Sequence, residues 1–506
     1  MASDVADVIV VGAGNAAFCA ALAAREQGAS VLMLEAAPED ESGGNSRFTA
    51  GSIRVVYNGV EDIRALVPDL TDEEVRTTDF GTYTQDQFFD DMARVTQDRA
   101  DPDLVELLVT RSFDTLKWMT TKGIRLIPIY GRQAFRIDGR FKFWGGLTVE
   151  AVGGGPGLIK MLTDSALKNG IKIQYDSRAV ELIYENGRVN GVRIRRDDGL
   201  HELRSRSVIL ACGGFEANAE MRTRYLGPGW DLAKVRGSRW NAGDGIRMAL
   251  EIGASPAGNW SGCHAVQWER NAPEFGDLAV GDQFQKHSYP FSILVNATGK
   301  RFVDEGADFR NYTYAKYGRV VLEQPGQFAW QIFDQKVKHL QRDEYRIKQI
   351  TKAAGNTIEE LAAKLDGVDA AEFIKTIAEW NKAVRIDIPF NPNIKDGRCT
   401  EGLVVNKSNL ANTFDAPPYE AYAVSCGVTF TFGGLRITTD GEVLNTDYRP
   451  IRGLYAAGEL VGGLFYFNYP GGTGLMAGSV FGRIAGNRAG SAGGIELVKS
   501  VRGGKA

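Results

Sequence analysis

The segment DVIVVGAGNAA at residues 7–17, followed by VLMLE at residues 31–35, has the residue order of a dinucleotide-binding unit. The apolar run before the glycines and the apolar run before Glu35 each predict a buried parallel strand. Gly12 and Gly14 permit a tight turn, and they let a pyrophosphate approach the backbone at the N-terminus of the helix that follows. A carboxylate at the position of Glu35 binds ribose hydroxyls and would repel a 2′-phosphate. This segment therefore predicts a Rossmann-like domain.

Length and composition indicate several domains and a large ligand. The chain has 506 residues, more than one simple core holds, and its 60 glycines occur largely in clusters. A net charge of −4 gives no basic surface for nucleic acid, and no apolar run is long enough to span a membrane. Five scattered cysteines without a C-x-x-C pair exclude thiolate-held iron–sulfur clusters and haem attachment, and we expect no metal site. Because no signal peptide is visible, we expect a cytoplasmic protein.

The secondary-structure signals change twice along the chain. Buried strand patterns and glycine turns dominate the first half, where a hairpin turn at 186–187 indicates a β-meander, and they return near the end. Between them the chain is richer in aromatic and charged residues, with helical patterns near 334–354, 357–365 and 369–385. We expect an α/β fold, with a parallel sheet, helices on both faces and an inserted α+β domain. The expected segments are residues 1–259 and 406–506 for the nucleotide-binding domain and residues 260–405 for the insert.

Glycine-rich motifs follow one another along almost the whole chain. They lie at residues 12–17 with Glu35, 43–46, 212–215, 243–245, 299–302 and 453–459. In these motifs and in their order the sequence resembles the FAD-dependent fumarate reductase/succinate dehydrogenase flavoprotein family. The resemblance implies an FAD-binding domain with an inserted capping domain, and an oxidoreductase that acts on CH–CH groups. The residues expected to contact the FAD are Gly12, Gly14, Asn15, Ala16, Glu35, Ala36, Gly44, Asn45, Ser46, Ala211, Gly213, Asp244, Gly458, Glu459, Gly474 and Leu475.

Further motifs are similar to those of the tricarballylate dehydrogenases within this family. They lie at residues 44–46, 262–265, 304–317, 429–434 and 468–474. The resemblance implies removal of two hydrogens across a C–C bond next to a carboxylate, which turns tricarballylate into cis-aconitate. A base must take one proton, cations must stabilise the charge that develops, and flavin N5 must accept hydride.

Three positions depart from the fumarate reductase pattern. Thr429 stands where those enzymes have a substrate-binding histidine, and Tyr469 stands where they have an arginine. The sequence Tyr-Pro-Gly at 469–471 is similar to that of 3-ketosteroid dehydrogenases, so a carbonyl compound is an alternative substrate. Phe48 occupies the region where the respiratory enzymes attach flavin to a histidine, and we therefore expect non-covalent FAD.

Arg310 is the first candidate for the chemistry. It lies nine residues after Arg301, and the resemblance places the proton-shuttling arginine of the family close to this position. Because arginine has a high pKa, it is a poor base unless it is buried beside other cations, and a role in holding a substrate carboxylate is chemically easier. An ion pair with Glu305 or Asp308 is the structural alternative.

Other polar residues are candidates for holding substrate or moving a proton. The resemblance places His264 where the family has a substrate-binding histidine, with a structural histidine as the alternative. Tyr312 could carry a proton, Thr429 could hold a substrate oxygen and Tyr469 could orient a carbonyl. Further candidates, each with a packing or surface role as the alternative, are Tyr314, Tyr317, Thr431, Arg47, Arg54, Arg132 and Arg136.

The leading hypothesis is an FAD enzyme acting on a small polycarboxylate. A 3-ketosteroid-like dehydrogenase or an enoate reductase on the same scaffold is the second hypothesis. A flavin carrier without turnover and a nicotinamide dehydrogenase are weaker, the latter because the sequence contains one clear adenine-nucleotide unit. With no haem or cluster ligands in the chain, reduced flavin needs a separate acceptor, which is another protein, a quinone or oxygen. The resemblance implies a membrane-associated partner, which would bring the protein to the membrane periphery.

Overall fold

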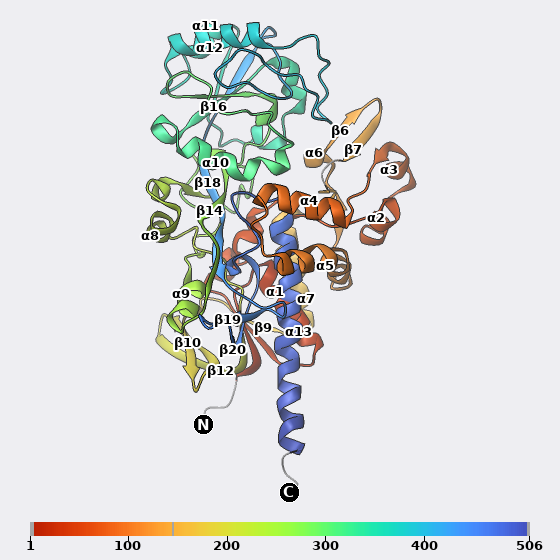
Figure 1. Ribbon diagram of the computed structural model, residues 1–506, viewed down its shortest axis with the longest axis vertical. Coiled ribbons are helices and arrows are strands. Elements are labelled where there is room, and N and C mark those ends of the chain that lie inside the picture. The colour runs from red at the N-terminus through yellow and green to blue at the C-terminus, as the bar shows by residue number, and fades with distance from the viewer. Residues whose placement is uncertain (1–4, 144–145, 503–506) are drawn as a thin grey trace.

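The computed structural model describes residues 5–143 and 146–502, and its largest sheet lies in the lower part of Figure 1. The strand order is β10-β11-β20-β12-β1-β2-β9, with β19 beside β20. The pairs around β1 are parallel, while β10, β11 and β12 form an antiparallel meander. The strands are β1 (Ala6–Val11), β2 (Val31–Leu34), β9 (Lys172–Gln174), β10 (Arg178–Glu185), β11 (Arg188–Arg196), β12 (Gly199–Leu210), β19 (Glu442–Leu444) and β20 (Pro450–Ala456). This sheet confirms the predicted Rossmann-like α/β fold.

Two helices from opposite ends of the chain pack against each other beside this sheet (Figure 1). They are α1 (Asn15–Glu26) and α13 (Thr473–Arg502). A Cβ added at Gly486 of α13 would lie 2.2 Å from the backbone oxygen of Ala20, so the two backbones approach too closely for a side chain there. The end of the chain thus completes the packing around the first strand–helix unit.

A second sheet extends from the large sheet into the upper part of Figure 1. Its long antiparallel strands β14 and β18 connect the two regions, and helices α10, α11 and α12 lie around its upper part. Helices α11 and α12 confirm the helical patterns predicted near 357–365 and 369–385. The division of the chain after residues 259 and 405 stays a prediction. The elements are β13 (Lys234–Val235), β14 (Pro256–Glu269), β15 (Ile293–Asn296), β16 (Ala329–Phe333), β17 (Lys352–Gly355), β18 (Tyr419–Leu435), α10 (Tyr314–Leu322), α11 (Ile358–Ala362) and α12 (Ala370–Ala383).

The helix predicted near 334–354 is wrong. The segment forms short 3-10 turns at Gln335–Leu340 and Asp343–Tyr345, and its end becomes β17, which pairs with β18. Its apolar side chains pack in a small separate cluster that includes Tyr422. Tertiary packing and strand pairing therefore override the local helical pattern here.

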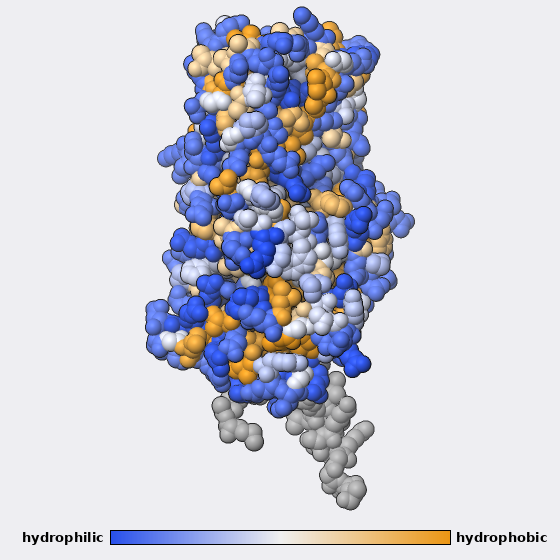
Figure 2. All heavy atoms as spheres, turned by 60° about the vertical axis from the view of Figure 1, so that its left-hand side comes forward, coloured by the Kyte–Doolittle hydropathy of each residue, from blue (hydrophilic) through white to orange (hydrophobic). Residues whose placement is uncertain are grey.

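The remaining elements cover the side of the large sheet and the junction between the two regions. They are α2 (Val60–Leu66), α3 (Asp72–Thr77), α4 (Gln85–Thr96), α5 (Pro102–Thr121), α6 (Tyr130–Gln133), α7 (Gly154–Lys168), α8 (Ala219–Met221), α9 (Asp244–Glu251), β3 (Ser52–Ile53), β4 (Thr78–Asp79), β5 (Leu126–Pro128), β6 (Ala134–Ile137), β7 (Arg140–Phe143) and β8 (Val149–Ala151). On the face in Figure 2, hydrophilic residues cover most of the surface and hydrophobic ones form separate groups. Among the helices that the structure describes, none combines the length and apolar character needed to cross a membrane.

Candidate active site

A groove crosses the carboxyl ends of β1, β2, β12 and β20, where sheets of this kind bind ligands. Each of these strands ends within two residues of a position that lines the groove. All but two of the predicted cofactor residues line it. They are Gly12, Gly14, Asn15, Ala16, Glu35, Ala36, Gly44, Asn45, Ser46, Ala211, Gly213, Asp244, Gly458 and Glu459.

The glycine turn at the start of α1 fits a bound pyrophosphate. Gly12 has a φ of +114°, and a Cβ there would lie 2.4 Å from the backbone oxygen of Ala211, so a larger residue does not fit. At Gly14 an added Cβ meets nothing closer than Ser46 Oγ at 3.6 Å, which leaves the backbone open to a ligand. Glu35 is buried at the far end of the groove, and its burial raises the pKa of the carboxyl group. The groove therefore matches the phosphate and ribose parts of a dinucleotide.

A deep cavity continues from this groove. The two share Asn15, Asn45 and Glu459 among their lining residues, and the remaining predicted cofactor residues, Gly474 and Leu475, line the deep cavity. An elongated ligand can therefore lie with its nucleotide in the groove and its other end in the deep cavity. This shape fits FAD, whose ring system extends well beyond the pyrophosphate.

Two buried carboxyl groups, of Glu216 and Glu459, interact electrostatically at the junction of groove and cavity. Glu216 Oε1 accepts hydrogen bonds from the side-chain amides of Asn45 and Asn241, each at 2.6 Å. Glu459 Oε1 accepts from the backbone N–H of Thr431 at 2.8 Å. Burial and the neighbouring Glu459 carboxyl raise the pKa of Glu216, because two adjacent buried carboxylates cannot both be charged. The surroundings of Glu216 therefore favour its protonated form.

Arg310 is buried and lines the deep cavity. Its Nη1 lies 3.4 Å from His287 Nδ1, and its guanidinium carbon lies 5.3 Å from the centre of the Tyr314 ring. Burial lowers the pKa of Arg310. The carboxylates considered as alternative partners are engaged elsewhere: Glu305 pairs with an arginine on its own segment, and Asp308 pairs with one on α4. Arg310 thus presents a buried charge to the cavity.

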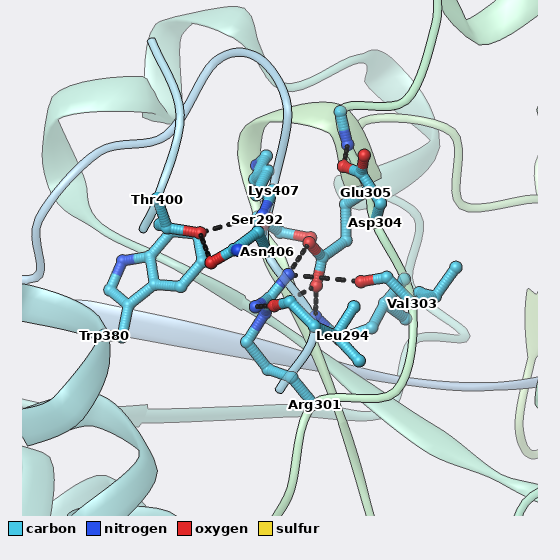
Figure 3. Close-up of polar contacts among 12 residues, drawn as sticks. Ser292, Leu294, Arg301, Val303, Asp304, Glu305, Trp380, Thr400, Asn406 and Lys407 are labelled. Atoms are coloured by element: carbon cyan, nitrogen blue, oxygen red, sulfur yellow. Dashed lines mark hydrogen bonds and ion pairs between the residues drawn. The ribbon is translucent and has the colours of Figure 1, made fainter. Parts of the chain in front are cut away.

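A buried ion pair anchors the segment that carries Arg310 (Figure 3). Arg301 Nη2 lies 2.6 Å from Glu305 Oε2, and the other carboxylate oxygen of Glu305 accepts the backbone N–H of Leu294 at 2.8 Å. Lys407 lies beside this pair and donates to two backbone oxygens at 2.7 and 2.8 Å. These contacts join the loop before Arg310 to β15 and to the segment before β18.

Two further arginines line the deep cavity and meet at one carboxylate. Arg132 Nη1 lies 2.8 Å from Asp282 Oδ2, and Arg236 Nη2 lies 4.0 Å from the same oxygen. Arg236 Nη1 donates to Thr429 Oγ1 at 3.3 Å, while within the described parts of the chain its buried Nε has no hydrogen-bond partner. Together with Arg310, these residues give the cavity more positive than negative charge.

His264 lies on an aromatic wall of the deep cavity. Its ring centre is 4.9 Å from that of Tyr314, 5.2 Å from Phe430 and 4.8 Å from Tyr469. Neither of its ring nitrogens has a hydrogen-bond partner among the described residues, and burial lowers the pKa of the imidazole. The hydroxyl groups of Tyr314 and Tyr469 form a hydrogen bond with each other. Four of the five predicted catalytic residues, His264, Arg310, Thr429 and Tyr469, thus line one cavity.

Tyr312, the fifth, lies in a separate network outside the deep cavity. Its hydroxyl donates to Asp91 Oδ2 at 2.7 Å, and the guanidinium carbon of buried Arg54 lies 5.4 Å from its ring centre. Arg47 and Arg136 bond to backbone oxygens near the surface and do not line the deep cavity either. Of the four arginines proposed as further carboxylate clamps, the structure thus brings only Arg132 to the deep cavity.

Sequence reasoning did not single out Arg236, His287 or Glu216. The scarcity of histidines was a usable signal for His287, because the chain contains four in all. Arg236 and Glu216 belong to no motif that marks them, and only the fold brings them to the cavity and to its junction with the groove.

Comparisons with known proteins agree with this geometry. The FAD binding domain family matches residues 7–475. The protein named "Probable fumarate reductase Ifc3" of Shewanella frigidimarina (strain NCIMB 400) is 30% identical over 96% of this chain and 75% of its own length. The solved open conformation of a flavocytochrome c3 fumarate reductase, also 30% identical, superimposes with a TM-score of 0.72 over 97% of this chain and 78% of its own.

A second kind of relative, a steroid dehydrogenase, matches a smaller part of this chain. The 3-oxosteroid 1-dehydrogenase of Mycobacterium tuberculosis (strain ATCC 25618 / H37Rv) is 30% identical over 66% of this chain, which spans 62% of that protein. Because the family match covers nearly the whole chain and the groove fits the nucleotide, the cofactor is FAD. The chain belongs to the FAD binding domain family and is an FAD-dependent oxidoreductase related to the flavoprotein fumarate reductases.

Proposed function

We propose that this protein dehydrogenates a small polycarboxylate next to a carboxylate group, with tricarballylate as substrate and cis-aconitate as product. The observation that carries the proposal is the buried charge of Arg310, which faces a cavity continuous with the FAD groove. Arg132 and Arg236 add two positive charges, and both lie within 4.0 Å of the Asp282 carboxylate. A buried excess of positive charge is costly unless a ligand supplies anions, and a tricarboxylate does so.

The residues of the cavity have different roles in such a reaction. FAD, when bound, supplies the acceptor for two electrons and a hydrogen. Arg310 binds the carboxylate next to the carbon that loses its proton, and the charge it carries stabilises the negative charge that develops there. Because a charged guanidinium cannot accept a proton, the proton is taken by a neutral histidine or tyrosine of the cavity, such as His287, whose Nδ1 lies 3.4 Å from Arg310 Nη1. Arg236, with Thr429, holds a second carboxylate away from the reacting bond.

FAD attachment and electron transfer complete the proposal. Phe48 is buried in the region where a histidine would carry a covalent flavin, which supports non-covalent binding. The electrons then leave to a separate protein or quinone. A membrane-associated partner of that kind would hold this otherwise cytoplasmic protein at the membrane periphery.

A ketone substrate is the second candidate. The paired hydroxyls of Tyr314 and Tyr469 lie in the deep cavity, and two phenols can hold a carbonyl oxygen as well as a carboxylate. The 3-oxosteroid dehydrogenase relative supports this reading, as either a ketosteroid-like dehydrogenase or an enoate reductase.

Anaerobic bleaching of the bound flavin separates the two candidates. The purified FAD-loaded protein is mixed without oxygen with tricarballylate, succinate or a 3-ketosteroid, and absorbance near 450 nm is followed. We expect tricarballylate to bleach the flavin fully and the steroid to leave it oxidised. Bleaching by the steroid alone would favour the ketone, and no bleaching by any acid would overturn the proposed function.

A further inference from the structure

A third cavity, here called the outer cavity, shares Arg310 and His287 with the deep cavity. These two residues therefore form a common wall between them. The outer cavity also contacts Ile394, which is 45% exposed, and Lys395, whose side chain is 55% exposed, so it reaches the surface of the protein. It is thus placed between solvent and the residue that we assign to the chemistry.

Arg342 lines the outer cavity and is only 9% exposed. Its Nη2 donates to the backbone oxygen of Arg132, while Nη1 is buried and has no hydrogen-bond partner within the described parts of the chain. Burial and the charge of Arg310 lower the pKa of Arg342 to about 9. A buried guanidinium in this position gains most from an added anion.

The nearby carboxylates do not contact Arg342 directly, although the charge of Glu344 partly offsets the lowering of the Arg342 pKa. Asp308 is held by Arg94 at 2.5 Å and by Lys395 at 3.7 Å. Glu344 accepts the backbone N–H of His287 at 3.1 Å. Their partners engage both groups, and neither forms an ion pair with Arg342 among the residues that the structure describes.

Apolar side chains form much of the remaining wall. Phe135, Phe291, Phe309 and Leu410 line the outer cavity and keep water away from its cationic end. In such surroundings a charge-assisted hydrogen bond is stronger than in water. On the solvent side Lys395 pairs with Asp308, so among the described residues the unpartnered positive charge of the outer cavity lies at Arg342.

We propose that the outer cavity is a binding site for a carboxylate of the incoming substrate. The anion is held first by Arg342 Nη1 and then passes to Arg310, which lines both cavities. The inference rests on the proposed function, because it concerns the same acid substrate. It adds a site outside the reacting cavity and gives Arg342 the role of a capture residue rather than a catalytic one.

The kinetic test uses the FAD-loaded protein and stopped-flow mixing with tricarballylate. In Arg342→Gln we expect the second-order rate constant of flavin bleaching to fall about 10-fold or more, and the limiting rate at saturating acid to fall less than about 3-fold. Arg342→Lys, which keeps a charge, restores most of the loss. The matched control is Arg346→Gln, an exposed arginine paired with Asp343, which changes neither constant. An unchanged second-order constant in Arg342→Gln would overturn the inference.

A direct test does not depend on turnover or on the folding of a variant. Crystals of the wild-type holoenzyme are soaked in bromide, and anomalous scattering locates the ion. We expect a bromide peak in the outer cavity within hydrogen-bond distance of Arg342. A bromide peak there would support the anion site. If tricarballylate also leaves the flavin oxidised in the bleaching experiment, the site would stand and the proposed substrate would be rejected. The absence of a peak would reject the site itself.

Discussion

Glu216 and Glu459 lie at the junction of groove and cavity, and the raised pKa of Glu216 makes stability depend on pH. Burial raises the pKa of Glu216 above its ordinary value of 4.5. The contribution of this carboxyl group to folding stability is therefore complete at low pH, and it is lost as the pH rises toward the raised pKa. We expect the contribution of Glu216 to the free energy of unfolding to fall by at most about 1.4 kcal/mol per pH unit between pH 5 and the raised pKa. Glu216→Gln should flatten this dependence, as measured by urea unfolding across pH 5–9.

Glu420 provides the control for that measurement. Although burial opposes it, hydrogen bonds from Lys338 and Lys352 lower the pKa of Glu420 to about 2. Glu420→Gln should therefore shift stability by the same amount at every pH from 6 to 9. A slope in Glu216→Gln equal to that of the wild type would contradict the raised pKa of Glu216.

The two tyrosines predicted as catalytic should behave differently. Tyr469 lies in the deep cavity, whereas Tyr312 donates to Asp91 in the separate network. We expect Tyr312→Phe to cost about 1 kcal/mol of stability and to change flavin bleaching by tricarballylate less than about 3-fold. Tyr469→Phe should slow bleaching at least about 10-fold at similar stability. Thermal unfolding and anaerobic absorbance measure the two effects. The reverse pattern would support a catalytic role for Tyr312.

At the scale of the elements, the contact between α1 and α13 holds the first strand–helix unit. Gly486 has no room for a side chain, because a Cβ would lie 2.2 Å from the backbone oxygen of Ala20. We expect Gly486→Leu to lower stability by about 2 kcal/mol or more and to weaken FAD binding, measured by thermal unfolding and FAD titration. Arg488→Ala, on the exposed side of the same helix, is the control and should change little. Equal effects of the two changes would show that this packing is unimportant.

The buried ion pair of Arg301 and Glu305, which anchors the segment that carries Arg310, gives a second prediction at this scale. Glu305 is fully buried and compensates Arg301. Glu305→Gln leaves that arginine without its counter-charge, and we expect a loss of about 3 kcal/mol in urea unfolding. Because the anchored segment carries Arg310, the variant should also bind tricarballylate more weakly while it keeps FAD. Wild-type stability in this variant would contradict the role of the anchor.

For the molecule as a whole, the sequence predicts the nucleotide groove better than the deep cavity. Residues 7–35 carry local signals, since the turn at Gly12, the helix start and Glu35 all lie within one strand–helix–strand unit. The deep cavity instead gathers Arg132, Arg236 and Arg310 from three distant segments, and only the fold brings them together.

The catalytic position predicted for Tyr312 and the helix predicted near 334–354 differ from the structure for the same physical reason. Tyr312 and Arg310 are two residues apart in one 3-10 turn, yet they lie in different environments. The segment 334–354 has a helical pattern but is held by pairing with β18 and by packing on Tyr422. In both cases tertiary contacts decide what local sequence leaves open.

The central claim is that FAD lies in the groove with its ring system in the deep cavity, where Arg310 meets the acid substrate. Anaerobic stopped-flow bleaching of wild type and Arg310→Ala, at equal FAD content, tests it most directly. Tricarballylate should bleach the wild-type flavin, and the limiting rate in Arg310→Ala should fall by about 1000-fold while the flavin stays bound. A colourless purified protein, or a variant that bleaches as fast as the wild type, would contradict the account.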